Sequence, residues 1–264
     1  MFFSKSPAAR CSIAPMSPTR EPWLAPPLDL ELGPDEAHVW LASLDVPAHR
    51  LSSLRALLNA EELARADRFL QPHHRCHSAV ARGGLRSLLG RYLQVAPQSV
   101  VFQFNAHGKP SLAGAHERSG LRFNLSHSHG LALIAFARGR DLGVDIEKVR
   151  PERPAEPIAE RFFAPAEAAR LRSLPSAQQP EGFFECWTRK EAYIKARGKG
   201  LSLPLDSFEV AFGPGVRPSI LGASDEPDAV ARWALFDLQP SAGFAGALVV
   251  ERPPCILRCW TLTP

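Results

Sequence analysis

The chain has 264 residues, of which 45% are hydrophobic and 22% are charged, and its formal net charge is +4. This length supports one large or two modest domains that bury most of the surface of the unfolded chain. No apolar run approaches the roughly 18–20 residues of a membrane helix, and the apolar start ends at Lys5, too early for a secretory leader. Five scattered cysteines without C-x-x-C spacing argue against disulfides and structural zinc. We therefore expect a cytoplasmic protein that does not contact membranes.

The numbers and positions of the Arg and Lys residues indicate which classes of molecule the protein binds. Of 31 basic residues, 25 are Arg and only six are Lys, and four of those lysines fall within 143–148 and 187–200. Compact ammonium groups suit phosphate oxygens. Acidic and basic residues alternate along the chain and form no basic stripe, which disfavours nucleic acid. Anionic small molecules or acidic protein partners are favoured, although chance and a bias toward Arg would also explain the pattern.

The first half of the chain combines a proline-rich leader with helices and then strands. Residues 1–36 contain seven prolines and no periodic pattern, which predicts a disordered or loosely packed leader. Asn59 and Glu62 have the spacing of a capping box at the start of a helix. The other predicted elements are a strand over 37–44, helices over 51–58 and 74–93, a strand over 99–104, a turn over 105–110, and strands over 121–125, 131–137 and 142–147.

The second half repeats this order loosely. It is predicted to contain a helix over 158–174 interrupted near Pro165, a helix over 183–197, and strands over 207–212, 231–237, 244–251 and 256–262. Helices followed by strands, twice over, predict an α+β fold of two similar lobes, a pseudo-twofold duplication in which each small antiparallel sheet packs with helices. The seam falls near Gly139, so the expected lobes are 37–138 and 139–264.

A pair of carboxylates marks the strand over 142–147. Alternation along a strand places Leu142, Val144 and Ile146 on the core face, and Asp145 and Glu147 together on the other. Two adjacent carboxylates repel each other unless a proton or cation lies between them, and Mg²⁺ accepts such an oxygen pair together with substrate phosphates. The alternative is an ordinary strand with acids on its exposed face.

A second segment, 187–195, is predicted to be helical with Trp187, Glu191 and Lys195 on one stripe. Glu191 could supply a third carboxylate to a metal or accept a proton, and Lys195 could bind phosphate. The alternative is a surface ion pair four residues apart. Trp187 on the same stripe argues against full exposure, because a large aromatic side chain favours a partly buried face.

The third segment reads FNLSHSHG over 123–130, between two strands. Ser126 and His127 could bind a phosphate through hydroxyl, backbone N–H and imidazole groups, or the segment could be a polar hairpin turn. A Ser-His catalytic pair is disfavoured, because adjacency in sequence does not place the His as a base. A metal site of His127 and His129 is disfavoured because no third nitrogen or sulfur ligand is evident.

Taken in order, FNLSHS, GVDIE and WTRKEAYIK resemble the 4′-phosphopantetheinyl transferase superfamily. The length and duplicated layout are similar to its large monomeric, Sfp-type branch, over roughly residues 37–250 and most closely over 187–210. The resemblance implies an enzyme that moves the phosphopantetheine arm of coenzyme A to a serine of an apo carrier protein and releases 3′,5′-ADP. Carrier proteins of fatty-acid, polyketide and nonribosomal-peptide biosynthesis are its expected substrates.

The resemblance also implies roles for the acidic and basic residues of the second lobe. Asp145, Glu147 and Glu191 would hold Mg²⁺ against the coenzyme A pyrophosphate. Glu191 is the candidate general base, directly or through water, and Lys195 would stabilise the charge that moves to the leaving ADP. Lys190 would contact phosphate or support the site.

Other matches concern coenzyme A itself. The resemblance implies that Ser126 and His127 bind a phosphate, His127 the 3′-phosphate. Lys109 and Pro110 match a stretch that contacts adenine. A position that often holds Arg in the family falls at His77 here, so Arg75 or His77 would take the 3′-phosphate contact.

The matched residues come from both halves, which predicts an active site at the lobe interface and a monomer. An acidic carrier domain would be drawn to basic residues beside it. Two other functions stay open at this point: another nucleotide phosphoryl-transfer enzyme, disfavoured because no phosphate-binding Gly-rich loop is present, and a non-catalytic relative, disfavoured because the carboxylates and lysines are all present.

Overall fold

The structure, a computed structural model, describes residues 23–252 and 256–262. Most of the expected loose leader, residues 1–22, therefore lies outside the described residues. The part that is described packs on the fold: Leu24 forms a parallel bridge with Trp260, and Leu32 is buried in the hydrophobic core. Within the described residues, no helix combines the length and apolar character that crossing a bilayer requires.

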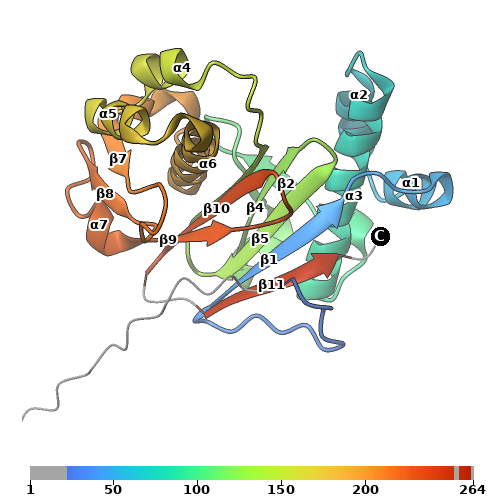
Figure 1. Cartoon of the computed structure of the whole chain (residues 1–264). Coiled ribbons are helices and arrows are strands. Elements are labelled where there is room, and N and C mark those ends of the chain that lie inside the picture. Colours follow the sequence, from blue (N-terminus) through green and yellow to red (C-terminus); the bar gives the residue numbers. More distant parts are fainter. Residues whose placement is uncertain (1–22, 253–255, 263–264) are drawn as a thin grey trace, which may run out of the picture.

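Two sheets and two short hairpins contain the strands (Figure 1). The first sheet has the order β11 (Ile256–Leu262), β1 (Glu36–Ser43), β5 (Leu131–Arg138), β4 (Leu121–Ser128). The second sheet has the order β6 (Leu142–Lys148), β10 (Phe244–Glu251), β9 (Trp233–Leu238). The hairpins are β2 (Phe102–Phe104) with β3 (Pro110–Leu112), and β7 (Phe208–Val210) with β8 (Ile220–Ala223).

The helices flank these sheets. They are α1 (Ala48–Arg55), α2 (Ala60–Asp67), α3 (Pro72–Leu93), α4 (Ala155–Phe162), α5 (Pro165–Ser173), α6 (Gln179–Arg197) and α7 (Ala229–Arg232). Asn59 and Glu62 form the expected capping box of α2, each side chain bonding the other residue's backbone N–H. The predicted interruption of the long helix near Pro165 is also confirmed, since α4 ends before α5 begins.

Alternation along the strands builds a core of four layers. One face of the first sheet packs on α3, with Leu88 of the helix and Phe136 of β5 in one cluster. Its other face packs on the second sheet, where Ala135 of β5 meets Val144 of β6. The far face of the second sheet packs on α6, so the order is α3, first sheet, second sheet, α6 (Figure 1).

This architecture confirms the expected α+β fold and changes two details. The sheets are antiparallel except that β11 pairs with β1 in parallel, so a strand from the end of the chain completes the first sheet. The predicted lobe boundary at 138/139 therefore does not assign every strand to the right sheet, because β11 belongs to the first. For the other elements, the two lobes stay a prediction. The short strands β3 and β8 were not predicted; at three and four residues, they leave little periodic pattern to detect.

The close approach of α6 to β6 depends on Gly143. A Cβ atom at this position would overlap the backbone of Ala192 and Ala196 in α6. We expect Gly143→Ala to destabilise the protein by about 1–3 kcal/mol, because α6 would have to move away from the sheet. Chemical denaturation measures this loss. Gly222→Ala is the control, since its Cβ would meet nothing within 4 Å; equal stability of the two variants would contradict the close approach.

Candidate active site

β4 and β6 are edge strands of the two sheets and lie side by side. Hydrogen bonds that involve side chains join them, in place of the backbone hydrogen bonds of a continuous sheet. Every second residue of β4 points toward β6, as strand alternation requires. Hydrogen bonds join the two strands from Val144 N to Asn124 Oδ1 (2.9 Å), from Ser126 Oγ to Asp145 Oδ1 (2.7 Å), and from Ser128 Oγ to Glu147 Oε2 (2.8 Å). The serines of FNLSHS therefore hold the carboxylates of GVDIE.

Asp145 occupies the centre of this arrangement and is only 4% exposed. Its Oδ1 accepts hydrogen bonds from Ser126 Oγ and, at 2.6 Å, from Lys195 Nζ. Its Oδ2 is buried and has no hydrogen-bond donor among the described residues. A buried carboxylate oxygen without a donor is costly, so a positive ligand at this atom would be stabilising.

Two further carboxylates, Glu147 and Glu191, face the same region from β6 and α6. Burial raises the pKa of Glu191, and the charges of Asp145 and Glu147 raise it further. Burial likewise raises the pKa of Glu147, and the charge of Asp145 adds to the effect. The three carboxylates are thus close enough to repel one another, and a cation would relieve this repulsion.

The three carboxylates do not by themselves form a complete site for a divalent cation. No group of three or more His, Cys, Asp or Glu side chains within residues 23–252 and 256–262 is arranged to enclose a metal ion. Lys195 instead provides the positive charge next to Asp145. Mg²⁺, however, commonly binds through one or two carboxylates together with waters and substrate phosphates. The unpartnered Asp145 Oδ2 and the neighbouring glutamates fit that mode of binding.

Imidazoles border the acidic centre on the side of the first sheet. His127 is exposed, and its pKa is lowered by the surrounding protein and then by the charges of Lys195, His77 and His74. His77 contacts Asp45 Oδ1 at 2.8 Å. Arg75 donates instead to the Phe69 carbonyl. Of the two residues expected to contact the 3′-phosphate, His77 is therefore the one whose charge acts on His127.

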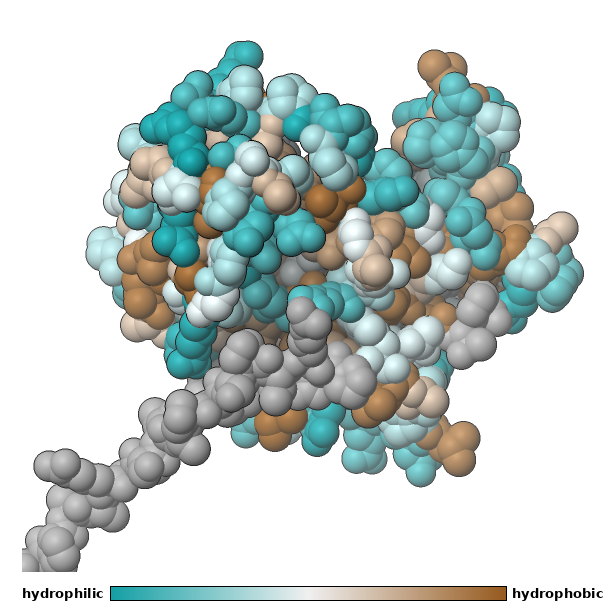
Figure 2. Space-filling view, in the orientation of Figure 1, coloured by the Kyte–Doolittle hydropathy of each residue, from teal (hydrophilic) through white to brown (hydrophobic). Residues whose placement is uncertain are grey.

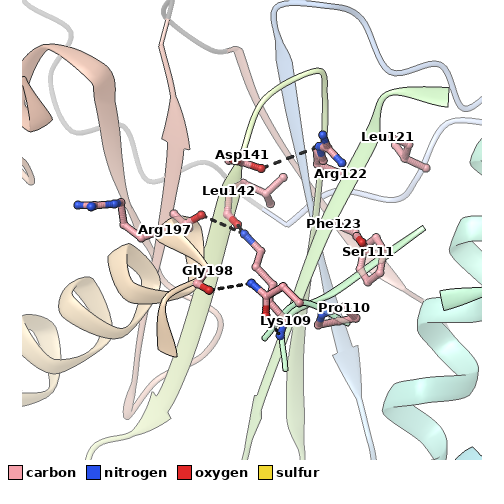
Figure 3. A pocket seen from close by; sticks show the side chains of 12 residues that line it. Lys109, Pro110, Ser111, Leu121, Arg122, Phe123, Asp141, Leu142, Arg197 and Gly198 are labelled. Carbon is pink, nitrogen blue, oxygen red and sulfur yellow. Dashed lines mark hydrogen bonds and ion pairs between the residues drawn. The ribbon is translucent and has the colours of Figure 1, made fainter. Parts of the chain in front are cut away.

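A pocket of about 210 Å³ opens where residues from the two halves meet at the start of β6 (Figure 3). Pro110 and Lys109 line it, but the Lys109 ammonium donates to the carbonyls of Leu142 and Ala196, at 3.0 Å each. Burial lowers the pKa of Lys109. This lysine joins the 105–110 turn to β6 and α6, so its ammonium is already partnered.

Lys190 requires a correction. It was expected to contact phosphate or to support the site, and the structure excludes the direct contact: Lys190 is fully buried and its Nζ pairs with Glu167 Oε2 at 2.6 Å. It also donates to the Phe208 carbonyl. Lys190 therefore links α6 to α5 and β7 inside the second lobe and does not reach the acidic centre. Its helical neighbours Cys186 and Ile194, four residues away on either side, are the apolar signal of a buried face.

This position yields a prediction about stability. Lys190→Met should destabilise the protein by about 3–5 kcal/mol, because it leaves the buried Glu167 carboxylate without its cation. Urea unfolding measures the change. Coenzyme A is the ligand expected from the sequence, and at low temperature its affinity for the folded fraction of the variant should equal its affinity for the wild type. Weaker binding without a loss of stability would show that Lys190 acts in the site.

Three residues around this centre have roles that were not predicted from the sequence. Ser128 and Asn124 bridge β4 to β6, and His74 acts on His127 from α3. Alternation was a usable signal for the first two, because Asn124, Ser126 and Ser128 share one face of a strand. Nothing local in the sequence identifies His74, which approaches through the tertiary fold.

Comparison with known proteins yields matches over most of the chain. A family model described as the 4′-phosphopantetheinyl transferase superfamily matches residues 141–249, and one described as 4′-phosphopantetheinyl transferase, N-terminal, matches residues 46–138. The chain is 43% identical to 4′-phosphopantetheinyl transferase HetI of Nostoc sp. over 228 residues, 86% of this chain and 93% of that protein. It is 39% identical to 4′-phosphopantetheinyl transferase Sfp of Bacillus subtilis over 129 residues, 48% of this chain and 54% of that protein.

Among solved structures, the chain is similar to the holo-[acyl-carrier-protein] synthase of Thermotoga maritima. The identity is 22% and the TM-score is 0.33, over 42% of this chain and 62% of that chain.

Proposed function

The chain belongs to the 4′-phosphopantetheinyl transferase superfamily, and we propose that it transfers the phosphopantetheine arm of coenzyme A to a serine of an apo carrier protein, releasing 3′,5′-ADP. As a 4′-phosphopantetheinyl transferase it is an enzyme. The observation that carries the fuller proposal is the buried Asp145, whose Oδ2 has no donor among the described residues while Glu147, Glu191 and Lys195 surround it.

In this reaction the carrier serine oxygen bonds to the β-phosphorus of the coenzyme A pyrophosphate, and the bond between that phosphorus and the ADP oxygen breaks. Glu191 takes the serine proton, directly or through a water. Its raised pKa suits this role, because a carboxylate with a higher pKa is a stronger base. Lys195, held beside Asp145 in the free enzyme, stabilises the negative charge that collects on the departing ADP.

The carboxylates Asp145 and Glu147, with Glu191 nearby, would hold Mg²⁺. When bound, the ion neutralises the pyrophosphate charge that otherwise repels the attacking oxygen. Ser126 and Ser128 keep the two carboxylates of β6 oriented. On the other side, His127 and His77 would bind the 3′-phosphate, and Pro110 with the Lys109 backbone would contact the adenine.

Two structural points support a monomer with an acidic partner. The proposed site takes Ser126 from the first sheet, Asp145 from the second, and Lys195 from α6, so one chain supplies every group. Lys148, Arg150 and Arg153 lie near His129 beside the site and give that border a positive charge. We propose that this charge attracts carrier domains of fatty-acid, polyketide or nonribosomal-peptide synthesis.

The test is an intact-mass assay with coenzyme A, MgCl₂ and a panel of apo carriers from these three classes. We expect one carrier or more to gain the mass of one phosphopantetheine, and chelation with EDTA to prevent the gain. A gain equal to a phosphate would instead indicate another phosphoryl transferase. Binding of coenzyme A without any mass gain across the panel would indicate a non-catalytic relative.

A further inference from the structure

The connection between α2 and α3 exposes large apolar side chains to solvent. Leu70 is 90% exposed and its neighbour Phe69 is 42% exposed. α2 and the start of α3 project beyond the sheets as an arm (Figure 1), and hydrophobic surface appears at the end of this arm in the space-filling view (Figure 2). We call residues 68–75 the arm tip. Exposed apolar side chains that lie next to each other can form part of a protein–protein contact surface.

The charge around the arm tip is positive. Residues 65–75, RADRFLQPHHR, contain three arginines, two histidines and a single acid. That acid, Asp67, is already paired with Arg55. Arg65 is paired with Glu61 at 3.6 Å, while Arg68 and Arg75 are exposed within the tip. An acidic partner therefore complements this surface, and a second copy of the same basic surface does not.

The arm tip is continuous with the candidate active site. Aromatic rings lead inward from Phe69: its ring lies 6.2 Å from that of His74, His74 lies 4.0 Å from His73, and His73 lies 5.9 Å from His77. Burial lowers the pKa of His129, which contacts Ser128. The charges of Arg150, Lys148 and then His74 lower this pKa further, so His74 lies near His129. A partner resting on the tip would thus lie over the border of the acidic centre.

We propose that the arm tip is a docking surface for the acidic carrier domain, with Phe69 and Leu70 against its apolar side chains and Arg68 and Arg75 opposite its carboxylates. The proposal rests on the proposed function, because it takes the carrier domain as the partner. In this proposal the arm tip of the first lobe binds the carrier domain together with the basic residues 148–153, which border the site on the second lobe. The two surfaces would hold the carrier from opposite sides of the acidic centre.

Binding separates this proposal from catalysis. An apo acyl carrier protein and an apo peptidyl carrier domain, each with its serine replaced by Ala, serve as probes that bind without reacting. We expect Leu70→Asp and Arg68→Glu each to raise the Kd for at least one probe by about 10-fold or more, as loss of an interface anchor does. Leu28→Asp, at a fully exposed leucine outside the tip, is the control and should leave the Kd unchanged.

Steady-state kinetics with the native carriers complete the test. Both arm-tip variants should raise the KM for carrier and leave the KM for coenzyme A and the melting temperature unchanged. Unchanged Kd and KM for carrier in both variants would overturn the proposal, and so would a dimer of the wild type that Leu70→Asp dissociates. If no carrier gains mass while the probes still bind through the tip, the proposed function fails and the docking surface stands.

Discussion

Asp145→Asn should lower the rate of phosphopantetheine transfer by about 10³-fold or more. The substitution keeps the shape of the side chain but removes the charge that Lys195 and Ser126 contact. It also replaces one of the two oxygens by an NH₂ group, which repels a cation. Removal of one preorganised charge-stabilising group typically costs about 10²–10³-fold, and here the cation and Lys195 lose their shared partner together.

Two measurements accompany the rate. Thermal unfolding of the wild type with coenzyme A should shift upward when MgCl₂ is added, because a ligand that binds only the folded state stabilises it; Asp145→Asn should lose this shift. Asp206→Asn, at an exposed carboxylate of another region, should keep both properties. A variant at Asp145 that retained a tenth of the wild-type rate would show that this carboxylate does not hold the cation.

Glu191→Gln should abolish transfer and yet stabilise the free protein. As the proposed base, Glu191 must accept the serine proton, and a neutral amide cannot do so. We expect a loss of about 10²–10⁴-fold, the usual contribution of a general base. In the wild type, transfer should decline as the pH falls through the raised pKa of Glu191, because the protonated carboxyl is not a base.

The stabilisation follows from the direction of the pKa shift. Folding raises the pKa of Glu191 above its ordinary value of 4.5, so the folded state favours the protonated carboxyl. Its contribution to stability is therefore greatest below pH 4.5 and is lost as the pH rises through the raised pKa. Gln resembles the protonated form at every pH. The melting temperature of the variant should exceed that of the wild type by about 2–4 °C at pH 7 for each 1 kcal/mol gained, and the difference should shrink toward pH 4.5.

Glu181→Gln provides the comparison on the same helix, since that side chain is exposed. It should leave the rate of transfer unchanged. If Glu191→Gln instead lowered the melting temperature at pH 7 without added metal, the crowding of the three carboxylates would be disproved.

Much of the site followed from strand alternation and helical spacing. Asp145 and Glu147 share a face because they are two residues apart on β6, and Glu191 and Lys195 share a stripe because they are four apart on α6. Val144 is buried between the two sheets, so the carboxylates of Asp145 and Glu147 lie on the opposite face of β6. Periodicity sufficed here because each element is long enough to show it.

The rest depended on partners that are distant in sequence. Lys190 and Glu191 are adjacent in α6 but have different surroundings. Lys190 is structural because it pairs with Glu167 of α5, whereas Glu191 lies near Asp145. The ammonium of Lys109 is partnered by carbonyls of β6 and α6, which local patterns do not reveal. Such pairings come from the packing of elements, so sequence spacing could not have predicted them.

The parallel pairing of β11 with β1 affects how the protein is made. The edge strand of the first sheet consists of residues 256–262, which are synthesised after the other three strands of that sheet, while its partner β1 is the first of the four to be synthesised. A nascent chain that has completed β4 and β5 still presents the open side of β1, a template for unwanted strand pairing. Domains often fold during synthesis, but the first sheet here cannot be completed until residues 256–262 have been made. A chain shortened before residue 256 therefore lacks the strand that covers the open side of β1.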